Sequence, residues 1–472
     1  MPARLKLAGL AVLVAAAILF TMSGCSNDKS PTKPSVDDSV RPVAVINLAA
    51  VSPTSSSITL TWTATGDDSL SGTASQYEIR YSQSPIADST WDSATPVAGV
   101  PRPKAAGRRE TFAVAGLSAS TPYYFALRVA DEKANWSGLS NVATDSTTAH
   151  QVWLPLGTGT NGPVYALTVY DGQLIAAGVF TSAGGAVVNH VAAWDGTAWL
   201  PLGSGTDYWI GAIAEYNGKL IAGGYFTNAG GVTANHIAAW NGSAWTSLGS
   251  GLDGSVHALT VYNGQLIAGG DFHSAGGKAA NDVAAWNGAS WTPLGSGMNG
   301  SVLTLTVYNG QLIAGGSFTS AGGTAASHVA VWNGSSWTGL GSGTDSWVAA
   351  LIQFNAQLIA GGDFTSAGGG AAGRTAAWNG VSWSELGLGM DARVYALTVH
   401  NGRLMAGGEF HTAGGGSASG IAAWNETVWM PLDSGTDGYV LALTVCNGQM
   451  TAGGSFTSAG GAAASNIAAW SD

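Results

Sequence analysis

The side chains that could do chemistry recur once every 46 residues in the C-terminal two-thirds of the chain. Three positions repeat in seven copies and supply carboxylates, amides, imidazoles and a guanidinium. Such groups can bind cations or sugars, or transfer protons. The first position holds only Asp or Asn: Asn161, Asp207, Asp253, Asn299, Asp345, Asp391 and Asp437. The second holds Val179, Tyr225, Asp271, Ser317, Asp363, Glu409 and Ser455, and the third His190, His236, Asp282, His328, Arg374, Gly420 and Asn466.

Two interpretations of the first position are open. An Asp or Asn after glycine commonly closes an Asx-turn by accepting a backbone N–H two residues on, which is a structural role. A ring of carboxylates that binds cations is the alternative, and its best candidate is Asp253, Asp271 and Asp282 of the third copy. Calcium needs roughly six to eight oxygen ligands, and no loop here has the DxDxDG spacing. We favour the structural role and assign no metal and no cofactor.

The same residues give little support for catalysis. The sequence holds no HExxH motif, no ordered Ser-His-Asp set and no Cys/His cluster at metal-ligand spacing. Cys446 replaces a tyrosine that recurs before an Asn-Gly turn, which indicates a packing role. All seven copies have the same length, whereas active sites usually lie in loops that break a repeat. A binding function is therefore favoured over an enzymatic one.

The elements that must position these groups follow from the 46-residue period. Seven copies (7 × 46 = 322) fill residues 151–472 without an insertion or deletion. A fixed period of roughly 20–50 residues predicts a propeller, a solenoid or an array. Two tryptophan series keep this period: Trp153, Trp199, Trp245, Trp291, Trp337, Trp383 and Trp429, and Trp194, Trp240, Trp286, Trp332, Trp378, Trp424 and Trp470.

Each copy predicts four short strands. In the third copy, the segment VHALTVY is apolar on both faces, which is typical of a strand covered on both sides. Asn263-Gly264 predicts a type I′ hairpin turn, and QLIAGGDF is the antiparallel strand after it. Strands over 282–286 and 291–294 follow. The repeats begin with a lone fourth strand and end with a third strand, so pairing these two would close a ring. We predict an all-β protein with a seven-bladed β-propeller over residues 148–472.

The modules resemble kelch-type propeller repeats, in the glycine pairs after the second strand and the tryptophans near the outer hairpin. This resemblance implies an alternative function, a carbohydrate-active lyase or oxidase, because kelch-like propellers include such enzymes. A copper oxidase of this kind needs Tyr, His and Cys to converge. Cys446 is expected at a turn opposite the ligand-binding face, which argues against that enzyme.

Ligands of propellers usually bind at the rim where the loops after the second and fourth strands open. The repeated polar positions are expected there, and so are the extra aromatics Tyr208-Trp209 and Trp347, whose ring faces can stack on a sugar. Repetition would make binding multivalent. The candidate ligand rim comprises Asp207, Trp209, Asp253, Asp271, Asp345, Trp347, Asp363, Asp391, Glu409 and Asp437.

The N-terminus carries an export signal. Basic residues precede an apolar run over residues 7–20, and small residues lead to Cys25. Ser-Gly-Cys resembles the bacterial lipobox, in which the cysteine becomes the lipidated N-terminus, although Met22 stands where leucine is usual. The resemblance implies a lipoprotein signal peptide over residues 1–25. Because Ser26 is not aspartate, it also implies the outer membrane if the cell is Gram-negative.

A linker and a second domain precede the repeats. Residues 26–41 are polar and contain proline, which predicts a flexible linker. Apolar side chains alternate in three segments of residues 42–147, which predicts a β-sandwich of about 100 residues. The segment resembles a fibronectin type III domain: Trp62 matches the core tryptophan, and Leu117 with Tyr123 matches the leucine and the corner tyrosine. The resemblance implies a spacer.

The negative charge is concentrated in the repeats. Residues 1–150 hold 12 Lys+Arg and 12 Asp+Glu, which leaves 17 − 12 = 5 basic and 28 − 12 = 16 acidic residues for the repeats. Nucleic acid binding needs clustered Lys and Arg and is not expected. We expect a monomeric, exported surface protein that is not an enzyme, is anchored by lipid on Cys25 and binds glycans or proteins through its propeller.

Overall fold

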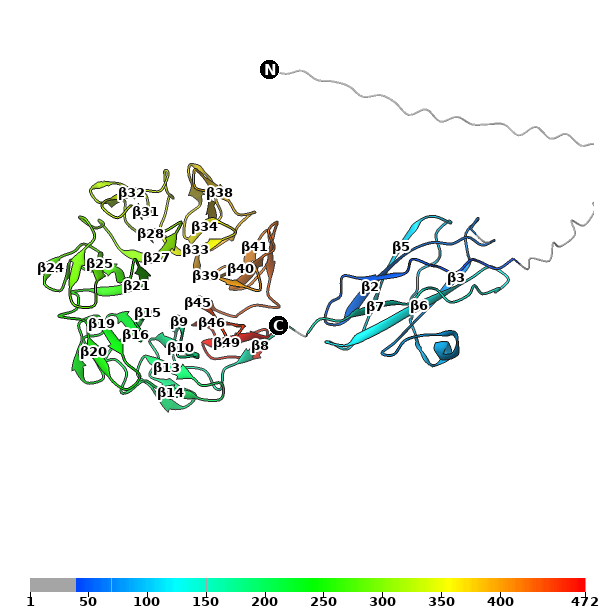
Figure 1. Ribbon diagram of the computed structural model, residues 1–472, viewed down its shortest axis with the longest axis horizontal. Coiled ribbons are helices and arrows are strands. Elements are labelled where there is room, and N and C mark those ends of the chain that lie inside the picture. The colour runs from blue at the N-terminus through cyan, green and yellow to red at the C-terminus, as the bar shows by residue number, and fades with distance from the viewer. Residues whose placement is uncertain (1–39, 69, 150, 472) are drawn as a thin grey trace, which may run out of the picture. The chain divides into compact units, whose positions relative to one another are not determined.

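The computed structural model describes residues 40–68, 70–149 and 151–471, so the predicted signal peptide, Cys25 and most of the linker lie outside the described residues. The regular secondary structure of the described residues is almost entirely β-strand (Figure 1). It divides into two compact units, and each is described by itself. No helix within these residues is long and apolar enough to cross a membrane.

The first unit is a sandwich of two antiparallel sheets. One sheet has the order β1-β2-β5 and consists of β1 (Ala49–Val51), β2 (Ser57–Thr63) and β5 (Arg109–Ala115). The other has the order β4-β3-β6-β7 and consists of β3 (Gln76–Ser82), β4 (Thr95–Pro96), β6 (Pro122–Ala130) and β7 (Ala143–Ser146). A short 3-10 helix, η1 (Asp88–Ser93), precedes β4.

The alternating apolar residues form the core of this sandwich, as predicted. Ile58, Leu60 and Trp62 on β2 are buried, because successive side chains of a strand point to opposite faces. The ring of Trp62 meets that of Tyr77 edge-on, with 5.2 Å between the ring centroids. Tyr123, at the predicted corner position, is also buried.

The second unit is a ring of seven four-stranded antiparallel sheets, the blades (Figure 1). The innermost strands are β9 (Val164–Tyr170), β15 (Ile210–Tyr216), β21 (Ser255–Tyr262), β27 (Val302–Tyr308), β33 (Val348–Phe354), β39 (Val394–His400) and β45 (Tyr439–Cys446). The second strands are β10 (Gln173–Gly178), β16 (Lys219–Gly224), β22 (Gln265–Asp271), β28 (Gln311–Gly316), β34 (Gln357–Gly362), β40 (Arg403–Gly408) and β46 (Gln449–Ser455).

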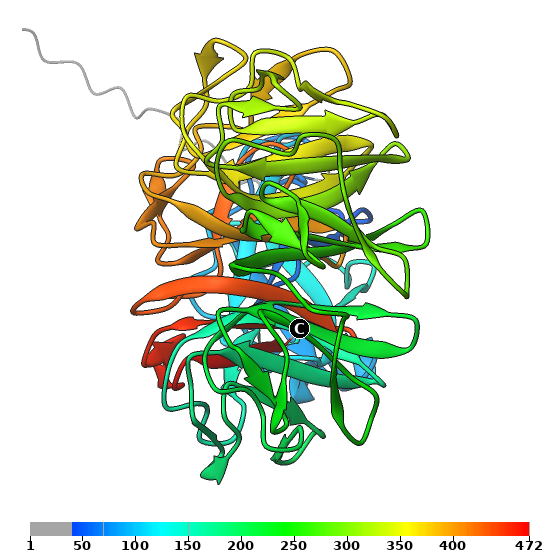
Figure 2. The same ribbon diagram turned by 90° about the vertical axis from the view of Figure 1, so that its left-hand side faces the viewer.

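Two shorter strands complete each blade on the outside. The third strands are β13 (Val191–Trp194), β19 (Ile237–Trp240), β25 (Val283–Trp286), β31 (Val329–Trp332), β37 (Thr375–Trp378), β43 (Ile421–Trp424) and β49 (Ile467–Ser471). The fourth strands are β14 (Trp199–Pro201), β20 (Trp245–Ser247), β26 (Trp291–Pro293), β32 (Trp337–Gly339), β38 (Trp383–Glu385), β44 (Trp429–Pro431) and β8 (Val152–Pro155). Figure 2 shows the ring from its edge.

The segment between the second and third strands, predicted to be a loop, holds a two-stranded hairpin in each blade. Each of its strands has two residues and flanks a glycine-containing turn, which is too short to leave a periodic signal in the sequence. The hairpins are β11 (Ser182–Ala183) with β12 (Ala186–Val187), β17 (Asn228–Ala229) with β18 (Val232–Thr233), β23 (Ser274–Ala275) with β24 (Lys278–Ala279), β29 (Ser320–Ala321) with β30 (Thr324–Ala325), β35 (Ser366–Ala367) with β36 (Gly370–Ala371), β41 (Thr412–Ala413) with β42 (Gly416–Ser417), and β47 (Ser458–Ala459) with β48 (Ala462–Ala463).

The two ends of the repeat region close the ring, as predicted. Strand β8 pairs with β49, and Trp153 lies opposite Trp470. The rings of these two tryptophans have centroids 5.1 Å apart. The innermost strands β45 of blade seven and β9 of blade one also contact each other, and we call this junction between blades seven and one the seam. Blade seven is therefore built from both ends of the repeat region.

A tryptophan hydrogen bond joins each blade to the one before it. The indole Nε1 donates to the backbone oxygen of a leucine 43 residues earlier, over 2.8–3.0 Å, in Trp199, Trp245, Trp291, Trp337, Trp383 and Trp429. In blade seven, the Nε1 atom of Trp153, which packs with Leu432 at the end of blade six, has no hydrogen-bond partner among the described residues. The junction between blades six and seven therefore lacks this bond, whereas the seam has it, from Trp199 to Leu156.

Close packing between and within blades explains the glycine pairs after the second strand. A β-carbon at Gly269 would collide with Val302 of the next blade, and one at Gly270 would collide with the backbone of Ser255. These glycines therefore serve packing rather than phosphate binding. In the predicted type I′ turn, Asn263 and Gly264 have φ values of 48° and 73°, as that turn requires.

Candidate functional site

The loops that follow the second and the fourth strands lie side by side in every blade. An isolated β-bridge joins them, for example between Leu252 and Ala275. We call the surface that these loops form the loop face. One oxygen of Asp253 accepts the backbone N–H groups of His273 and Ser274, each over 2.8 Å. The same pair of bonds is made by Asn161, Asp207, Asn299, Asp345, Asp391 and Asp437.

This geometry corrects the predicted Asx-turn. The donors lie 20 and 21 residues further along the chain, not two, so the side chain ties two loops together. An amide oxygen serves as well as a carboxylate, which explains why the position holds only Asp or Asn. In Asp207, burial is the largest influence and raises the pKa, but hydrogen bonds from Asn228 and Thr227 together lower the pKa to about 2. That carboxylate is therefore ionised at neutral pH.

A β-bulge near the start of each innermost strand leaves one residue outside the regular pairing. In β21 the register shifts between Val256 and Ala258, which leaves His257 unpaired, and the other six blades show the same shift. Bulges often re-aim a side chain beside a binding or active site. His257 and Tyr395 line a shallow central depression of about 230 Å³. The bulged residues are Tyr165, Gly211, His257, Leu303, Ala349, Tyr395 and Leu441.

None of these bulged residues was among the predicted site residues, although the repeats carry a signal for them. The residue before the bulge is always Val or Ile, whereas the bulged position ranges from Gly to Tyr. A variable position directly after a constant apolar one indicates a side chain outside the packed core. That pattern, read across the seven copies, would have added Tyr165, His257 and Tyr395.

Five rings from blades one, two and three meet on the loop face. Trp209 stacks on Tyr225 with 6.0 Å between centroids and an interplanar angle of 11°, and on His257 with 5.8 Å and 19°. Tyr165 meets Trp209 edge-on at 6.2 Å, and Tyr208 meets Tyr225 at 5.5 Å. We call Tyr165, Tyr208, Trp209, Tyr225 and His257 the aromatic cluster. It brings together residues up to 92 positions apart in sequence (257 − 165).

The expectation that Trp209 itself presents a ring face to a sugar is corrected by this arrangement. Two parallel rings, those of Tyr225 and His257, shield the indole, which is half-buried. The most exposed members are instead Tyr208 and Tyr225, each with 53% of its surface accessible. Trp209 therefore holds the cluster in place, and the tyrosines present it to solvent.

Trp347, the other predicted aromatic, belongs to a charged cluster in blades five and six. Its ring stacks on Tyr395 at 6.1 Å, and the guanidinium of Arg393 lies 5.9 Å from its centroid. Arg393 forms ion pairs with Asp363 at 3.4 Å and with Glu409 at 3.3 Å. Burial, aided by the hydrogen bond to Glu409, raises the pKa of Tyr395 to about 12. The predicted ligand contacts Asp363 and Glu409 are thus already paired within the protein.

The structure does not gather Asp253, Asp271 and Asp282 around one cation. Asp253 holds its loops together, and Asp271 accepts hydrogen bonds from His257 Nε2 at 2.8 Å and from the hydroxyl of Ser301. Among the described residues, no group of three or more Asp, Glu, His or Cys side chains is arranged to hold a metal ion.

Asp271 and Asp282 nevertheless line one cavity of about 400 Å³, together with His273. Asp282 is only 7% exposed. Burial raises its pKa to about 6, and the nearby Asp271 contributes to the rise. The pKa of Asp271 is lowered: burial again raises it most, but hydrogen bonds from Ser301 and His257 outweigh burial. Two carboxyl groups with opposite pKa shifts therefore face the same cavity.

The third repeated position has a left-handed backbone in every blade, with φ between 63° and 73°. Burial lowers the pKa of His190, His236 and His328 at this position, so these imidazoles are neutral at neutral pH. They lie one per blade, as predicted from their spacing. His190 packs against Tyr208 at 6.5 Å and His236 against Tyr225 at 5.9 Å, so both support the aromatic cluster.

Comparison with known proteins supports both domain types. Residues 41–145 match the family model of the fibronectin type III domain, and residues 217–238 match that of "Domain of unknown function (DUF5122) beta-propeller". No curated protein sequence matches the chain significantly. The first unit is thus a fibronectin type III domain and the second a β-propeller, whereas the kelch-type and lipobox resemblances stay predictions.

Solved structures with similarity to the chain are matched over about a quarter of its length. Domains A168–A170 of titin are 18% identical with a TM-score of 0.17, and the match covers 23% of this chain and 32% of that structure. The sensor domain of the anti-sigma factor RsgI4 in Pseudobacteroides cellulosolvens is 21% identical with a TM-score of 0.17, and the match covers 24% of this chain and 99% of that structure.

Proposed function

We propose that this protein is an exported, lipid-anchored binding protein whose propeller binds a glycan at the aromatic cluster. Fibronectin type III and propeller domains together indicate an extracellular interaction protein. Glycan binding at the aromatic cluster is supported above all by the exposure of Tyr208 and Tyr225, at 53% each, on a support of packed rings. The fibronectin type III domain then acts as a spacer between membrane and propeller.

The chemistry of the cluster suits a sugar. Tyrosine offers an apolar ring that packs on the C–H face of a pyranose and a hydroxyl that hydrogen-bonds its polar edge. The side chains are held by their neighbours before any ligand arrives, which reduces the entropy lost on binding. His257 belongs both to the cluster and to the central depression, so a glycan chain can run from one into the other.

The geometry favours one principal binding surface over seven equal ones. Exposed stacking rings gather in blades one to three, while Trp347 in blade five is paired with Tyr395 and Arg393. The acidic position that recurs in all blades is engaged in tying loops together. Multivalent binding by the whole rim therefore has less support than the aromatic cluster alone.

A carbohydrate-active enzyme is the second candidate, and one observation favours it. Asp271 and Asp282 line one cavity, with one pKa lowered and the other raised to about 6. Such a pair can divide the roles of base and acid in glycoside hydrolysis. In the binding experiment below, release of new reducing ends from the bound glycan would identify this enzyme.

Replacing both exposed tyrosines should weaken glycan binding. The variant Y208A/Y225A removes two stacking contacts, each worth about 0.5–1.5 kcal/mol, so affinity should fall by about 5- to 150-fold. The melting temperature should barely change, because surface substitutions usually alter stability by less than about 0.5 kcal/mol. A glycan array selects the oligosaccharide, and isothermal titration calorimetry measures its Kd.

Tyr439 provides the matched control for this variant. It is an exposed tyrosine, 48% accessible, in blade seven and outside the aromatic cluster. Y439A should bind the selected glycan with unchanged affinity. Equal affinity of Y208A/Y225A and the wild type, or the absence of any glycan ligand, would refute binding at the aromatic cluster.

Lipid on Cys25 should be the membrane anchor. The variant C25A removes the sulfur that would carry the lipid, so we expect the protein to leave the membrane fraction for the soluble one. Fractionation followed by immunoblotting measures this shift. Cys446, the other cysteine, supplies the control, and C446A should remain with the membranes. Retention of C25A in the membrane fraction would show that lipid on Cys25 is not the anchor.

A further inference from the structure

The residue before each inner-hairpin turn fills the groove between neighbouring blades at six of the seven junctions. The position is aromatic or imidazole in blades one to six and a thiol in blade seven. The series is Tyr170, Tyr216, Tyr262, Tyr308, Phe354, His400 and Cys446. Cys446 lies at the seam, where blade seven meets blade one.

Three of the four tyrosines of this series cross the groove and bond to the next blade. The hydroxyl of Tyr216 donates to the backbone oxygen of Gly264 at 3.3 Å, and Tyr170 and Tyr308 make equivalent bonds at 3.2 and 3.0 Å. Tyr216 packs in one buried cluster with Leu266 and Trp286 of the next blade. Each of these three rings thus has one carbonyl acceptor at its end, and that of Tyr216 lies in an apolar pocket.

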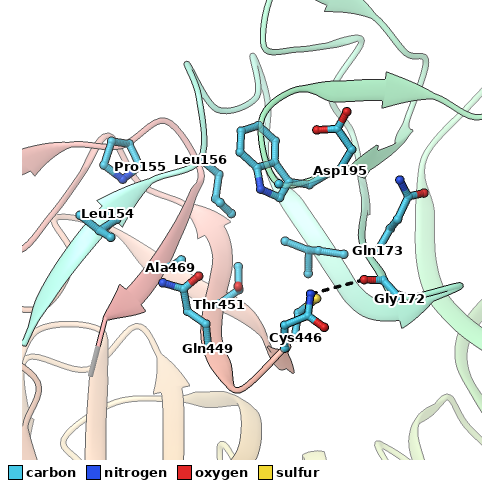
Figure 3. A pocket seen from close by; sticks show the side chains of 14 residues that line it. Leu154, Pro155, Leu156, Gly172, Gln173, Asp195, Cys446, Gln449, Thr451 and Ala469 are labelled. Carbon is cyan, nitrogen blue, oxygen red and sulfur yellow. Dashed lines mark hydrogen bonds between the residues drawn. The ribbon is translucent and has the colours of Figure 1, made fainter.

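At the seam, the equivalent apolar pocket is present, but Cys446 provides no ring to fill it. Leu174 and Trp194, which correspond to Leu266 and Trp286, line an open cavity of about 350 Å³ with Cys446 (Figure 3). The corresponding acceptor is the backbone oxygen of Gly172, which accepts a long bond of 3.5 Å from the side-chain amide of Asn447. Thr451 stands where five of the other six blades have isoleucine, which leaves further room.

We propose that this seam pocket binds one phenol ring, which takes the place of the missing tyrosine and donates its hydroxyl to the backbone oxygen of Gly172. The ligand is either a small free phenol or a tyrosyl side chain of a partner protein. Both present the same ring and hydroxyl to the same walls. The proposal is independent of the glycan site, because the pocket lies at the inner-hairpin turns and shares no residue with the aromatic cluster.

The pocket recognises the phenol by its shape and by a hydrogen bond, not by a reaction of the Cys446 thiol. Burial raises the pKa of the Cys446 thiol, so it is not activated as a nucleophile. The walls contributed by Leu154, Leu156, Leu174 and Trp194 are apolar, and a planar ring can pack on them. The Gly172 oxygen then distinguishes a phenol from an arene without a hydroxyl group.

The probe is 4-fluorophenol, titrated into the protein from residue 42 onward and followed by fluorine NMR. We expect saturable binding at one site, and about 3- to 10-fold weaker binding of fluorobenzene, which lacks the hydroxyl. C446Y should abolish binding, because the tyrosine fills the pocket as it does at the other junctions. C446A should still bind, because the cavity stays open without the thiol.

Tyr216 allows a gain-of-site control. Y216C should create a second pocket like the seam, so about twice as much probe should bind at saturation. N-acetyl-tyrosinamide forms the second arm: competition with 4-fluorophenol supports a tyrosyl side chain as the ligand, and its failure to compete supports a small free phenol. Absence of saturable 4-fluorophenol binding, or unchanged binding by C446Y with a wild-type melting temperature, would overturn the proposal.

Discussion

Deletion of residues 151–157 lowers the midpoint of thermal unfolding of the propeller by at least about 10 °C. The deletion removes β8, in which Trp153 is buried, and also Leu156, and it leaves β49 with an unpaired edge. Truncating one buried Trp or Leu alone costs about 2–5 kcal/mol, and here both are lost together with a strand of hydrogen bonds. Because each blade packs on two neighbours, the loss spreads around the ring, and differential scanning calorimetry should show it.

The transition of the fibronectin type III domain serves as an internal reference in the same calorimetric trace. The fibronectin type III domain is a separate unit, so its transition should stay where it is in the full chain. L154A, in the same strand, is the matched control: Leu154 is 44% exposed, and its replacement should change stability by less than about 0.5 kcal/mol. An unchanged propeller midpoint after the deletion would mean that β8 does not close the ring.

Replacement of Asp282 by asparagine stabilises the propeller at neutral pH. The pKa of this buried carboxyl is about 6 in the folded protein and 3.8 in a model peptide. The folded state therefore holds the proton more strongly than the unfolded state, and ionisation of Asp282 above pH 6 costs about 2–3 kcal/mol of stability. D282N removes that cost, and it copies Asn466, whose amide at the same position in blade seven donates to Thr160.

The sign of the pH dependence follows from the raised pKa. The contribution of Asp282 to stability is present in full below pH 3.8 and is lost as the pH rises through 6. The stability difference between D282N and the wild type should therefore be large at pH 7.5 and below about 1 kcal/mol at pH 4. Asp253, a carboxylate with a lowered pKa, supplies the contrast: D253N should not stabilise the protein at pH 7.5. Equal effects of D282N at both pH values would contradict the buried-carboxyl explanation.

Much of the fold was predictable because its determinants are local or periodic. The tryptophan spacing of 46 residues, the Asn-Gly turns and the alternation around Trp62 each report a strand or turn formed by neighbours in sequence. The count of strands per copy, and the unpaired strand at each end, were enough to predict closure between Trp153 and Trp470. Residues 151–157 and 467–470 are far apart in sequence, but a ring of equal blades offers each of them only one unpaired edge.

The candidate site was predicted in part, because position within a copy shows which loop a residue occupies. The placement of Asp207 in a loop and of Asp271 at the end of a second strand was readable in this way. Their partners were not: Asp207 reaches a loop 20 residues away, and Asp271 is held by His257 and Ser301. Such partners depend on how neighbouring strands are twisted and bulged, and this geometry cannot be inferred from the sequence of a single repeat.

The sequence by itself determined the period, the strands and turns of each blade, the sandwich before them and the excess of acidic residues in the repeats. Only the tertiary structure decided that His257 and Tyr225 would stack on Trp209, that Asp282 would be buried, and that Cys446 would leave a cavity at the seam. The physical reason is the same in each case. Backbone propensity and side-chain alternation act over a few residues, whereas stacking, burial and cavities arise where different strands, loops and blades meet at the angle set by the closed ring.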